Sequence, residues 1–315
     1  MKTSPVTPAD LSASVLSVPP LARNADLRVN PDANRALIRH LEAGGVRTLM
    51  YGGNANFYNI GTGEYAVIVD SLAEAAGKDT WVIPSVGPDY GKAMDQAAIL
   101  RDRKFPTAMV LPLPQGYPCT DAGAAKGIRR IAEAFGKPVI VYVKAEGYIS
   151  PETTAALLND GTACAVKYAI VRNDPAKDDF LAKLVTLTDR SKIISGIGER
   201  PAIVHLRDFG LKGFTSGSVC VAPRGSMRLL ELLKAQRYDE AEKVRAAYIP
   251  LEDARDEYSP IRVLHEAVTL AGIADMGPML PMLSNLDSQH HARVKEAASK
   301  LLAHDRALTA ELAAA

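Results

Sequence analysis

The chain has 315 residues, of which 47% are hydrophobic and 23% are charged. That composition is typical of a folded globular protein and excludes disorder over the whole length. The 37 Lys and Arg residues nearly balance the 36 Asp and Glu residues, giving a formal net charge of +1, which argues against a nucleic-acid-binding protein that relies on overall positive charge.

The sequence carries no clear signal for export or membrane insertion. The first twenty residues hold one Lys and no sustained apolar stretch, so we expect no secretory signal. The most apolar later segment, residues 267–283, is interrupted by Asp275 and two prolines, so we expect no transmembrane helix. Three cysteines are too few for a disulfide framework, which favours a reducing compartment. We therefore expect a soluble, cytoplasmic protein with no membrane or nucleic-acid partner.

Short apolar runs recur along the first two thirds of the chain, each followed by a longer amphipathic stretch. Several runs are continuously apolar, as in residues 139–141, which is typical of parallel strands buried on both faces. The eight runs are Ser14–Val18, Arg47–Tyr51, Trp81–Val86, Thr107–Pro112, Pro138–Val143, Cys164–Ala169, Lys192–Gly196 and Gly213–Ser216.

The intervening stretches have the pattern of helices. Residues 34–43 place Leu37, Ile38 and Leu41 near one face, and Gly44 then supplies a C-terminal stop. Eight strands that alternate with helices predict an α/β protein with a closed (β/α)8 TIM barrel. An open doubly wound sheet would usually carry a glycine-rich turn after its first strand, and none follows residues 14–18.

The pattern changes after about residue 225, where helices follow one another without strands. We expect the barrel to occupy residues 1–225 and a C-terminal helical extension to occupy residues 226–315. The helices expected there are Met227–Ala235, Tyr238–Tyr248, Pro260–Ala271 and His291–Ala303.

Lys167 is the most unusual polar residue of the eight runs, because it lies in an otherwise nearly apolar strand. Burial disfavours the ammonium form, and a partly uncharged amine is the nucleophile needed for a Schiff base with a carbonyl. The alternative is a strand-end Lys that reaches solvent along its stem. Tyr142 closes the preceding strand, so its hydroxyl could approach the amine and carry a proton; the alternative is an aromatic residue that fills the barrel.

A glycine- and asparagine-rich turn, residues 51–57, follows the second run. Gly52 and Gly53 let the backbone approach a ligand, and successive N–H groups there could bind a carboxylate. Asn54 and Asn56 can also donate hydrogen bonds. We expect Gly53, Asn54 and Asn56 to bind substrate, with an ordinary turn as the alternative.

A second turn, residues 61–64, competes with the first as the carboxylate site. It lies immediately before the helical stretch 65–69, where Thr62 is expected to cap the helix and Glu64 to favour its positive end. The first turn directly follows a strand, which is where barrel ligands bind, so we favour it.

Metal-dependent chemistry has little support in the sequence. His205 and His265 lie in predicted helices, and the pair His290-His291 has no evident third ligand. We expect no metal and no other cofactor.

At Lys167, Tyr142 and the eight-run pattern, the chain resembles the dihydrodipicolinate synthase/N-acetylneuraminate lyase family, from about residue 14 to residue 302. The Ser195-Gly196 pair is similar to the family's strand-seven Ser-Gly. Residues 213–224 are similar to its strand-eight signature, and Ser259-Pro260-Ile261 is similar to the start of its C-terminal helix.

The resemblance implies roles and partners that composition and spacing do not show. It implies that Lys167 forms a Schiff base with pyruvate, that Tyr142 moves protons, and that Gly196 and Thr215 contact substrate. It also implies a homotetramer built as a dimer of dimers.

The chain departs from the family pattern at several positions. Gly53-Asn54 stands where the family has a Thr pair, and Leu113-Pro114 stands where the synthases have a relay Tyr, although Tyr117 is close by. The synthase Arg that binds the second substrate falls at Gly147, with Lys144 or Tyr148 as candidate replacements.

We therefore expect a Schiff-base lyase, an aldolase or dehydratase acting on pyruvate or another 2-oxo acid, and not an authentic dihydrodipicolinate synthase. A non-catalytic or regulatory relative that binds a 2-oxo acid is the alternative.

Overall fold

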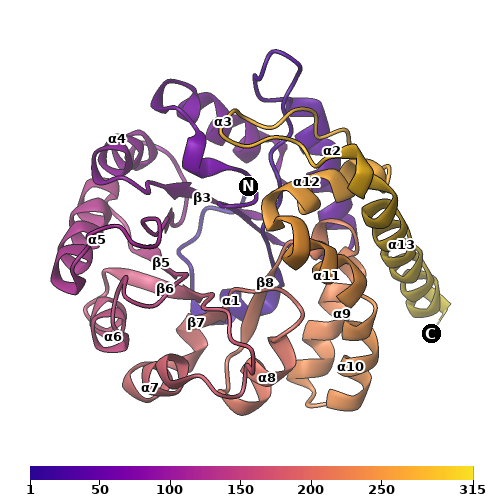
Figure 1. Cartoon of the computed structure of the whole chain (residues 1–315). Coiled ribbons are helices and arrows are strands. Elements are labelled where there is room, and N and C mark those ends of the chain that lie inside the picture. Colours follow the sequence, from indigo (N-terminus) through magenta and orange to yellow (C-terminus); the bar gives the residue numbers. More distant parts are fainter. Residues whose placement is uncertain (315) are drawn as a thin grey trace.

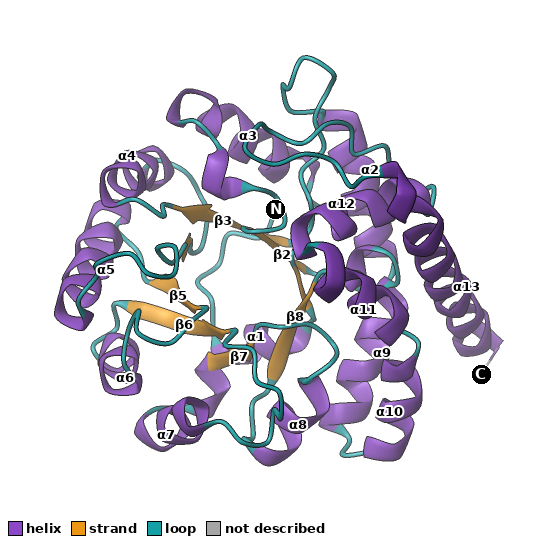
Figure 2. Cartoon of the chain, in the orientation of Figure 1, coloured by secondary structure: helices purple, strands orange, loops and turns teal. Residues whose placement is uncertain are grey.

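A computed structural model describes residues 1–314, with side chains described through residue 311, and shows a closed eight-stranded parallel barrel surrounded by helices (Figure 1, Figure 2). Neighbouring strands pair in chain order, and β1 closes the ring by pairing with both β2 and β8. The strands are β1 Leu16–Ser17, β2 Thr48–Tyr51, β3 Trp81–Val86, β4 Met109–Val110, β5 Val139–Val143, β6 Ala163–Tyr168, β7 Ile193–Ser195 and β8 Gly213–Ser216. Each of the eight predicted runs overlaps one of these strands, and β6 begins one residue before its run, so the predicted barrel is confirmed.

One helix follows each strand around the outside of the barrel. These are α2 Pro31–Ala43, α3 Thr62–Ala75, α4 Tyr90–Arg101, α5 Asp121–Phe135, α6 Pro151–Asn159, α7 Asp179–Leu187, α8 Ala202–Asp208 and α9 Pro223–Lys234. Short 3-10 turns interrupt the connections at η1 Phe57–Asn59, η2 Arg190–Lys192, η3 Ser218–Cys220 and η4 Ser288–His290.

The remaining helices lie before and after the barrel. They are α1 Pro8–Ala13, α10 Tyr238–Ala246, α11 Ile249–Tyr258, α12 Pro260–Leu270 and α13 His291–Ala314. The predicted C-terminal helical extension is confirmed, but α1 and α11 were not predicted. The proposed division between residues 225 and 226 falls inside α9 and stays a prediction.

Helix α2 shows how local sequence sets these elements. Its N-cap residue Asn30 accepts a hydrogen bond from the Ala33 N–H, and its C-cap is Gly44. Leu37, Ile38 and Leu41 are fully buried, as their spacing predicts.

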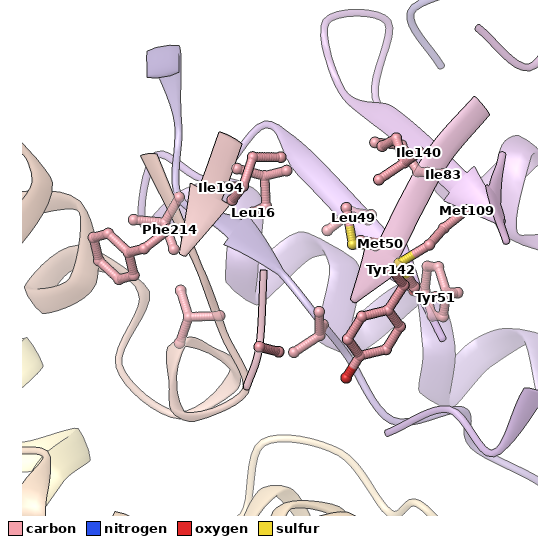
Figure 3. Close-up of a cluster of buried hydrophobic side chains, with 14 of the residues drawn as sticks. Leu16, Leu49, Met50, Tyr51, Ile83, Met109, Ile140, Tyr142, Ile194 and Phe214 are labelled. Carbon is pink, nitrogen blue, oxygen red and sulfur yellow. The ribbon is translucent and has the colours of Figure 1, made fainter. Parts of the chain in front are cut away.

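The barrel strands are buried on both faces, which explains why their sequences do not alternate. Every residue of β5 is buried, although successive side chains point to opposite sides of the strand. Figure 3 shows side chains of several strands, among them Leu49, Ile83 and Ile140, packed in one hydrophobic cluster. A polar side chain inside this barrel is therefore surrounded by apolar atoms.

A buried pair of carboxyl groups joins the barrel to the C-terminal helices. Glu199 lies in the connection after β7, Glu252 lies on α11, and both are 0% exposed. The Glu199 N–H donates to Glu252 Oε1 at 3.0 Å, and Ser226 Oγ of α9 donates to Glu199 Oε1 at 2.6 Å. Among the described residues, the second oxygen of each carboxyl has no hydrogen-bond partner. Burial, and then the neighbouring Glu252 charge, raise the pKa of Glu199 to about 7, and burial also raises the pKa of Glu252.

The carboxyl pair predicts that stability falls as the pH rises. A carboxyl whose pKa is higher in the folded state stabilises the fold below its unfolded pKa, and this contribution is lost as the pH rises through the folded pKa of about 7. We expect Glu199→Gln to reduce the fall in the free energy of unfolding between pH 5 and pH 8, as measured by urea denaturation. The control, Glu133→Gln, changes a carboxylate whose side chain is 65% exposed. Equal pH dependence in the wild type and Glu199→Gln would contradict this prediction.

Candidate active site

Lys167 lies inside the barrel without a counter-ion. On β6 it pairs in register with Tyr142 of β5 and Ile194 of β7, and the residue is 5% exposed. Among the described residues, none forms a hydrogen bond or ion pair with its amine. Burial, followed by the positive charge of Lys144, lowers the pKa of Lys167 to about 7. A substantial fraction of this amine is therefore uncharged at neutral pH.

Tyr142 packs directly against that amine. The Lys167 Nζ atom lies 4.4 Å from the centroid of the Tyr142 ring, and Tyr142 is 8% exposed. Burial, with a smaller contribution from Tyr58, raises the pKa of the Tyr142 phenol above its usual value. The phenol is therefore protonated at neutral pH and able to donate a hydrogen bond beside the amine.

A cavity of about 270 Å³ opens next to Lys167. Because all eight strands are parallel, residues at their carboxyl ends meet there. The structure brings most of the predicted site residues into its lining, together with segments of α11 and α12. The predicted residues that line it are Gly53, Asn54, Tyr142, Lys167, Gly196 and Thr215.

Asn54 and Asn56 differ in where the turn after β2 places them. The Asn54 Nδ2 group donates to the Val18 carbonyl at 3.0 Å, which fixes the carboxamide in the cavity wall. Asn56 is not among the residues that line this cavity, and its substrate-binding role stays a prediction. Its left-handed backbone (φ 56°) leads the chain into η1, and its Oδ1 atom accepts a hydrogen bond from Asn59 at 2.9 Å. Gly52 contributes by packing, since a Cβ atom there would lie 2.6 Å from the Met109 Cε atom.

The competing turn at residues 61–64 does not line the cavity. Thr62 does not cap α3 as we predicted, because Gly61 is the N-cap, no side chain caps the helix, and Thr62 is the first helical residue. Glu64 lies in the first turn and forms an ion pair with the buried Arg23 at 2.8 Å.

A second cavity, of about 530 Å³, adjoins the first on the side of the loops that follow β4 and β5. Lys144 lines both cavities, and Tyr58, Tyr117 and Tyr148 line the second. Gly147, where the resemblance places a synthase Arg, also lies in this wall and carries no side chain.

Lys144, Arg255 and Asp256 are further charged residues of the first cavity; the sequence indicated Lys144 only as a candidate replacement for the synthase Arg, and it did not indicate Arg255 or Asp256. Lys144 stands directly after the apolar strand β5, which is a signal that the sequence did offer. Arg255 and Asp256 come from α11, which the sequence analysis did not predict.

Gly196 lies against Lys167 where no other residue fits. A Cβ atom at this position would lie 2.7 Å from the Tyr168 carbonyl oxygen and 2.9 Å from Lys167 Cγ. The stem of Lys167 is therefore held by the backbone that follows β7.

Over residues 1–314, no group of three or more His, Cys, Asp or Glu side chains is arranged to hold a metal ion. Both candidate histidines are used locally. His205 bonds Ser195 Oγ through Nδ1 at 2.8 Å, and His265 Nε2 lies 2.9 Å from the Gly277 carbonyl.

The fold and the cavity define the class of protein: a (β/α)8 barrel with an unpaired lysine amine at the mouth formed by the carboxyl ends of its strands. Residues 13–301 match the family model described as the dihydrodipicolinate synthetase family, and the chain belongs to that family. Characterised members of the family are lyases.

Curated relatives are similar over most of the chain. A 4-hydroxy-tetrahydrodipicolinate synthase of Chlorobium limicola is 24% identical over 269 residues, which cover 83% of this chain and 88% of the relative. An uncharacterised DapA-like lyase of Halobacterium salinarum is 26% identical over 295 residues, which cover 88% of this chain and 91% of the relative.

Solved structures share the fold. The dihydrodipicolinate synthase of Bacillus clausii superposes with a TM-score of 0.81 at 23% identity, over 92% of this chain and 98% of that one. The sialic acid aldolase of Ruminococcus gnavus superposes with a TM-score of 0.82 at 14% identity, over 94% of this chain and 99% of that one.

Among the helices described here, none is both long and apolar enough to cross a bilayer.

The close packing at Gly196 predicts a site-specific loss of stability. We expect Gly196→Ala to lower the free energy of unfolding by about 1–3 kcal/mol, because the added methyl group overlaps the Tyr168 carbonyl and the Lys167 stem. The matched control is Gly63→Ala in α3, where a Cβ atom meets nothing within 4 Å. That change should be neutral or stabilise by up to about 1 kcal/mol. Equal effects of the two substitutions in urea denaturation would show that the contact at Gly196 is not restrictive.

Proposed function

We propose that the protein is a Schiff-base-forming lyase, an aldolase or dehydratase, that acts on pyruvate or another 2-oxo acid through Lys167. The observation that carries the proposal is the buried Lys167 amine, which lacks a counter-ion, has a pKa of about 7 and lies in a cavity at the barrel mouth. At pH 7 about half of such amines are uncharged, against about one in three thousand for a lysine with the usual pKa of 10.5.

The proposed reaction begins with attack of the uncharged amine on the C2 carbonyl of the 2-oxo acid. The carbinolamine then loses water, and the protonated imine acts as an electron sink. When the C3–C4 bond breaks or a proton leaves C3, the protonated imine accepts the electron pair that remains on C3 and becomes a neutral enamine. Tyr142 is the proposed proton carrier, because its ring centroid lies 4.4 Å from the Lys167 Nζ atom and its phenol lines the same cavity.

The substrate carboxylate is proposed to bind at the turn after β2. Gly53 and Asn54 line the same cavity as Lys167, and two successive backbone N–H groups form an anion-binding concavity. Gly196 and Thr215 line the same cavity and are proposed to contact the bound substrate.

The alternative is a relative that binds a 2-oxo acid without turnover. It is favoured by Leu113-Pro114, which stands where the synthases have a relay tyrosine, and by Gly53-Asn54, which stands where they have a threonine pair. Turnover of a panel of 2-oxo acids and aldehydes separates the two, because both proposals include imine formation and only the first includes bond cleavage.

The proposal includes a homotetramer built from two dimers, because members of this family are typically oligomeric. Light scattering at the mass of one chain over a range of concentrations would contradict it.

Covalent trapping tests the role of Lys167. With pyruvate and sodium cyanoborohydride, we expect the intact mass to rise by one reduced pyruvate adduct, and peptide mapping to locate the adduct at Lys167. Lys167→Ala should abolish both trapping and turnover while the protein stays folded by circular dichroism. The control Lys234→Ala removes another lysine whose pKa burial lowers, outside the cavity, and should trap pyruvate normally. Trapping of pyruvate at another lysine of Lys167→Ala would overturn the assignment.

Substitution of Tyr142 tests the proton carrier. Tyr142→Phe keeps the ring that covers the amine and removes the hydroxyl, so pyruvate trapping at saturation should persist. Turnover should fall by roughly 100-fold or more, the scale of a lost general acid or base. An unchanged kcat would mean that another group moves the proton.

A further inference from the structure

Two lysine amines share one small cavity. Lys144 follows the end of β5 and Lys167 lies on the adjacent strand β6, and both line the cavity of about 270 Å³. Among the described residues, no carboxylate forms an ion pair with either amine. The site therefore holds two potential positive charges without a compensating negative one.

The other charged groups in this wall are already paired with one another. Arg255 of α11 forms ion pairs with Asp256 at 2.9 Å and with Glu252 at 3.3 Å. The β5 side contributes the protonated phenol of Tyr142. Strand β8 and the segments after β2 and β7 contribute uncharged residues, among them Thr215, Asn54 and Gly196. Lys144 is consequently the one unpaired charge facing Lys167 within the described lining.

The surroundings of the two amines differ in a way that decides which one keeps its proton. Partial desolvation lowers the pKa of Lys144 as well, but Lys144 is an exposed residue whereas Lys167 is 5% exposed, so desolvation disfavours the ammonium form of Lys167 more. The Lys144 Nζ atom also lies 5.8 Å from the centroid of the Tyr58 ring, whose π face favours a cation. Like charges in a confined, poorly solvated volume repel, so the more enclosed amine loses its proton first.

We propose that Lys144 is a positioning residue for the reaction proposed above: its ammonium charge in the shared wall keeps the Lys167 amine uncharged and nucleophilic at neutral pH. This inference rests on the proposed function for its purpose, but it concerns a charge interaction that is measurable without substrate. The direction agrees with the lowered pKa of Lys167, for which burial is the larger cause and the Lys144 charge the second.

The chemistry of imine formation explains why this matters. Only the uncharged amine has the lone pair that forms the C–N bond with C2. The carbonyl oxygen takes up protons and leaves as water, so the step needs no oxidant or reductant. An ammonium at Lys167 would block the first bond, whereas an ammonium at Lys144 does not.

Competitive acetylation with acetic anhydride tests the inference, because it reports the protonation of each lysine without requiring pyruvate to bind. The extent of acetylation at Lys167 is read by peptide mass between pH 5.5 and pH 10. We expect a wild-type midpoint near pH 7, in line with the pKa of about 7. Lys144→Met should raise the midpoint by about one pH unit, which lowers the uncharged fraction of the Lys167 amine at pH 7 by about fivefold.

Two further variants separate charge from structure. Lys144→Arg keeps the charge and should leave the midpoint close to that of the wild type. Lys300→Met removes an equal charge from a side chain on α13 that is 74% exposed, and it should have no effect. At pH 10 all variants should react alike, which shows that the site is still folded. If Lys144→Met is poorly folded, Lys144→Gln removes the same charge with a polar side chain.

The outcomes distinguish this inference from the proposed function. A midpoint in Lys144→Met equal to that of the wild type would overturn the inference, whatever pyruvate does. A shifted midpoint in Lys144→Met, together with no trapping of pyruvate by the wild type, would support the charge interaction and overturn the proposed function. If Lys144→Met traps pyruvate only at a higher pH than the wild type, and Lys144→Arg does not need the higher pH, the result would support both the charge interaction and the proposed function.

Discussion

The candidate site depends on the closure of a parallel barrel. Strand β1 has only two residues, Leu16 and Ser17, yet it pairs with both β2 and β8 and so completes the ring. In a closed parallel barrel, the carboxyl ends of all strands reach the same rim. That constraint brings Tyr142 of β5 and Lys167 of β6 into register, with the backbone of Gly196 after β7 against the lysine stem. No one strand carries the site; it exists only when the ring is closed.

Burial then determines what the site can do chemically. The apolar interior that makes the strand sequences easy to recognise also makes the ammonium form of Lys167 costly. Within the described part of the chain, no carboxylate pairs with this amine to offset that cost, and the phenol ring of Tyr142 lies against it instead. Desolvation of Lys167 therefore has two effects. It lowers the stability of the fold, because the ammonium form is costly to bury, and it makes the amine more nucleophilic, because the uncharged form is favoured.

The sequence predicted the strands well because each is a continuous apolar run, and it predicted Lys167 because a charge interrupts one of them. It failed at α11, whose buried face includes Glu252 and Arg255, so that apolar periodicity is absent there. It did not show that Asn56 has a left-handed backbone and lies outside the cavity lining, because spacing along a turn does not reveal backbone angles. It made Thr62 a cap because an N-cap and the first helical residue differ by one position, which only the backbone angles decide.

The helices α11 and α12, which follow the barrel in the sequence, form part of the cavity wall. Residues 255–264 of α11 and α12 supply Arg255, Ser259, Pro260 and Leu264 to its wall, although they lie far beyond the eighth strand in the sequence. A chimera that took only the barrel strands from this protein would keep the Lys167 amine but would lose the residues of α11 and α12 that line its cavity. The complete cavity therefore requires both the barrel and the helices α11 and α12. A chimera between relatives has to take both from the same parent.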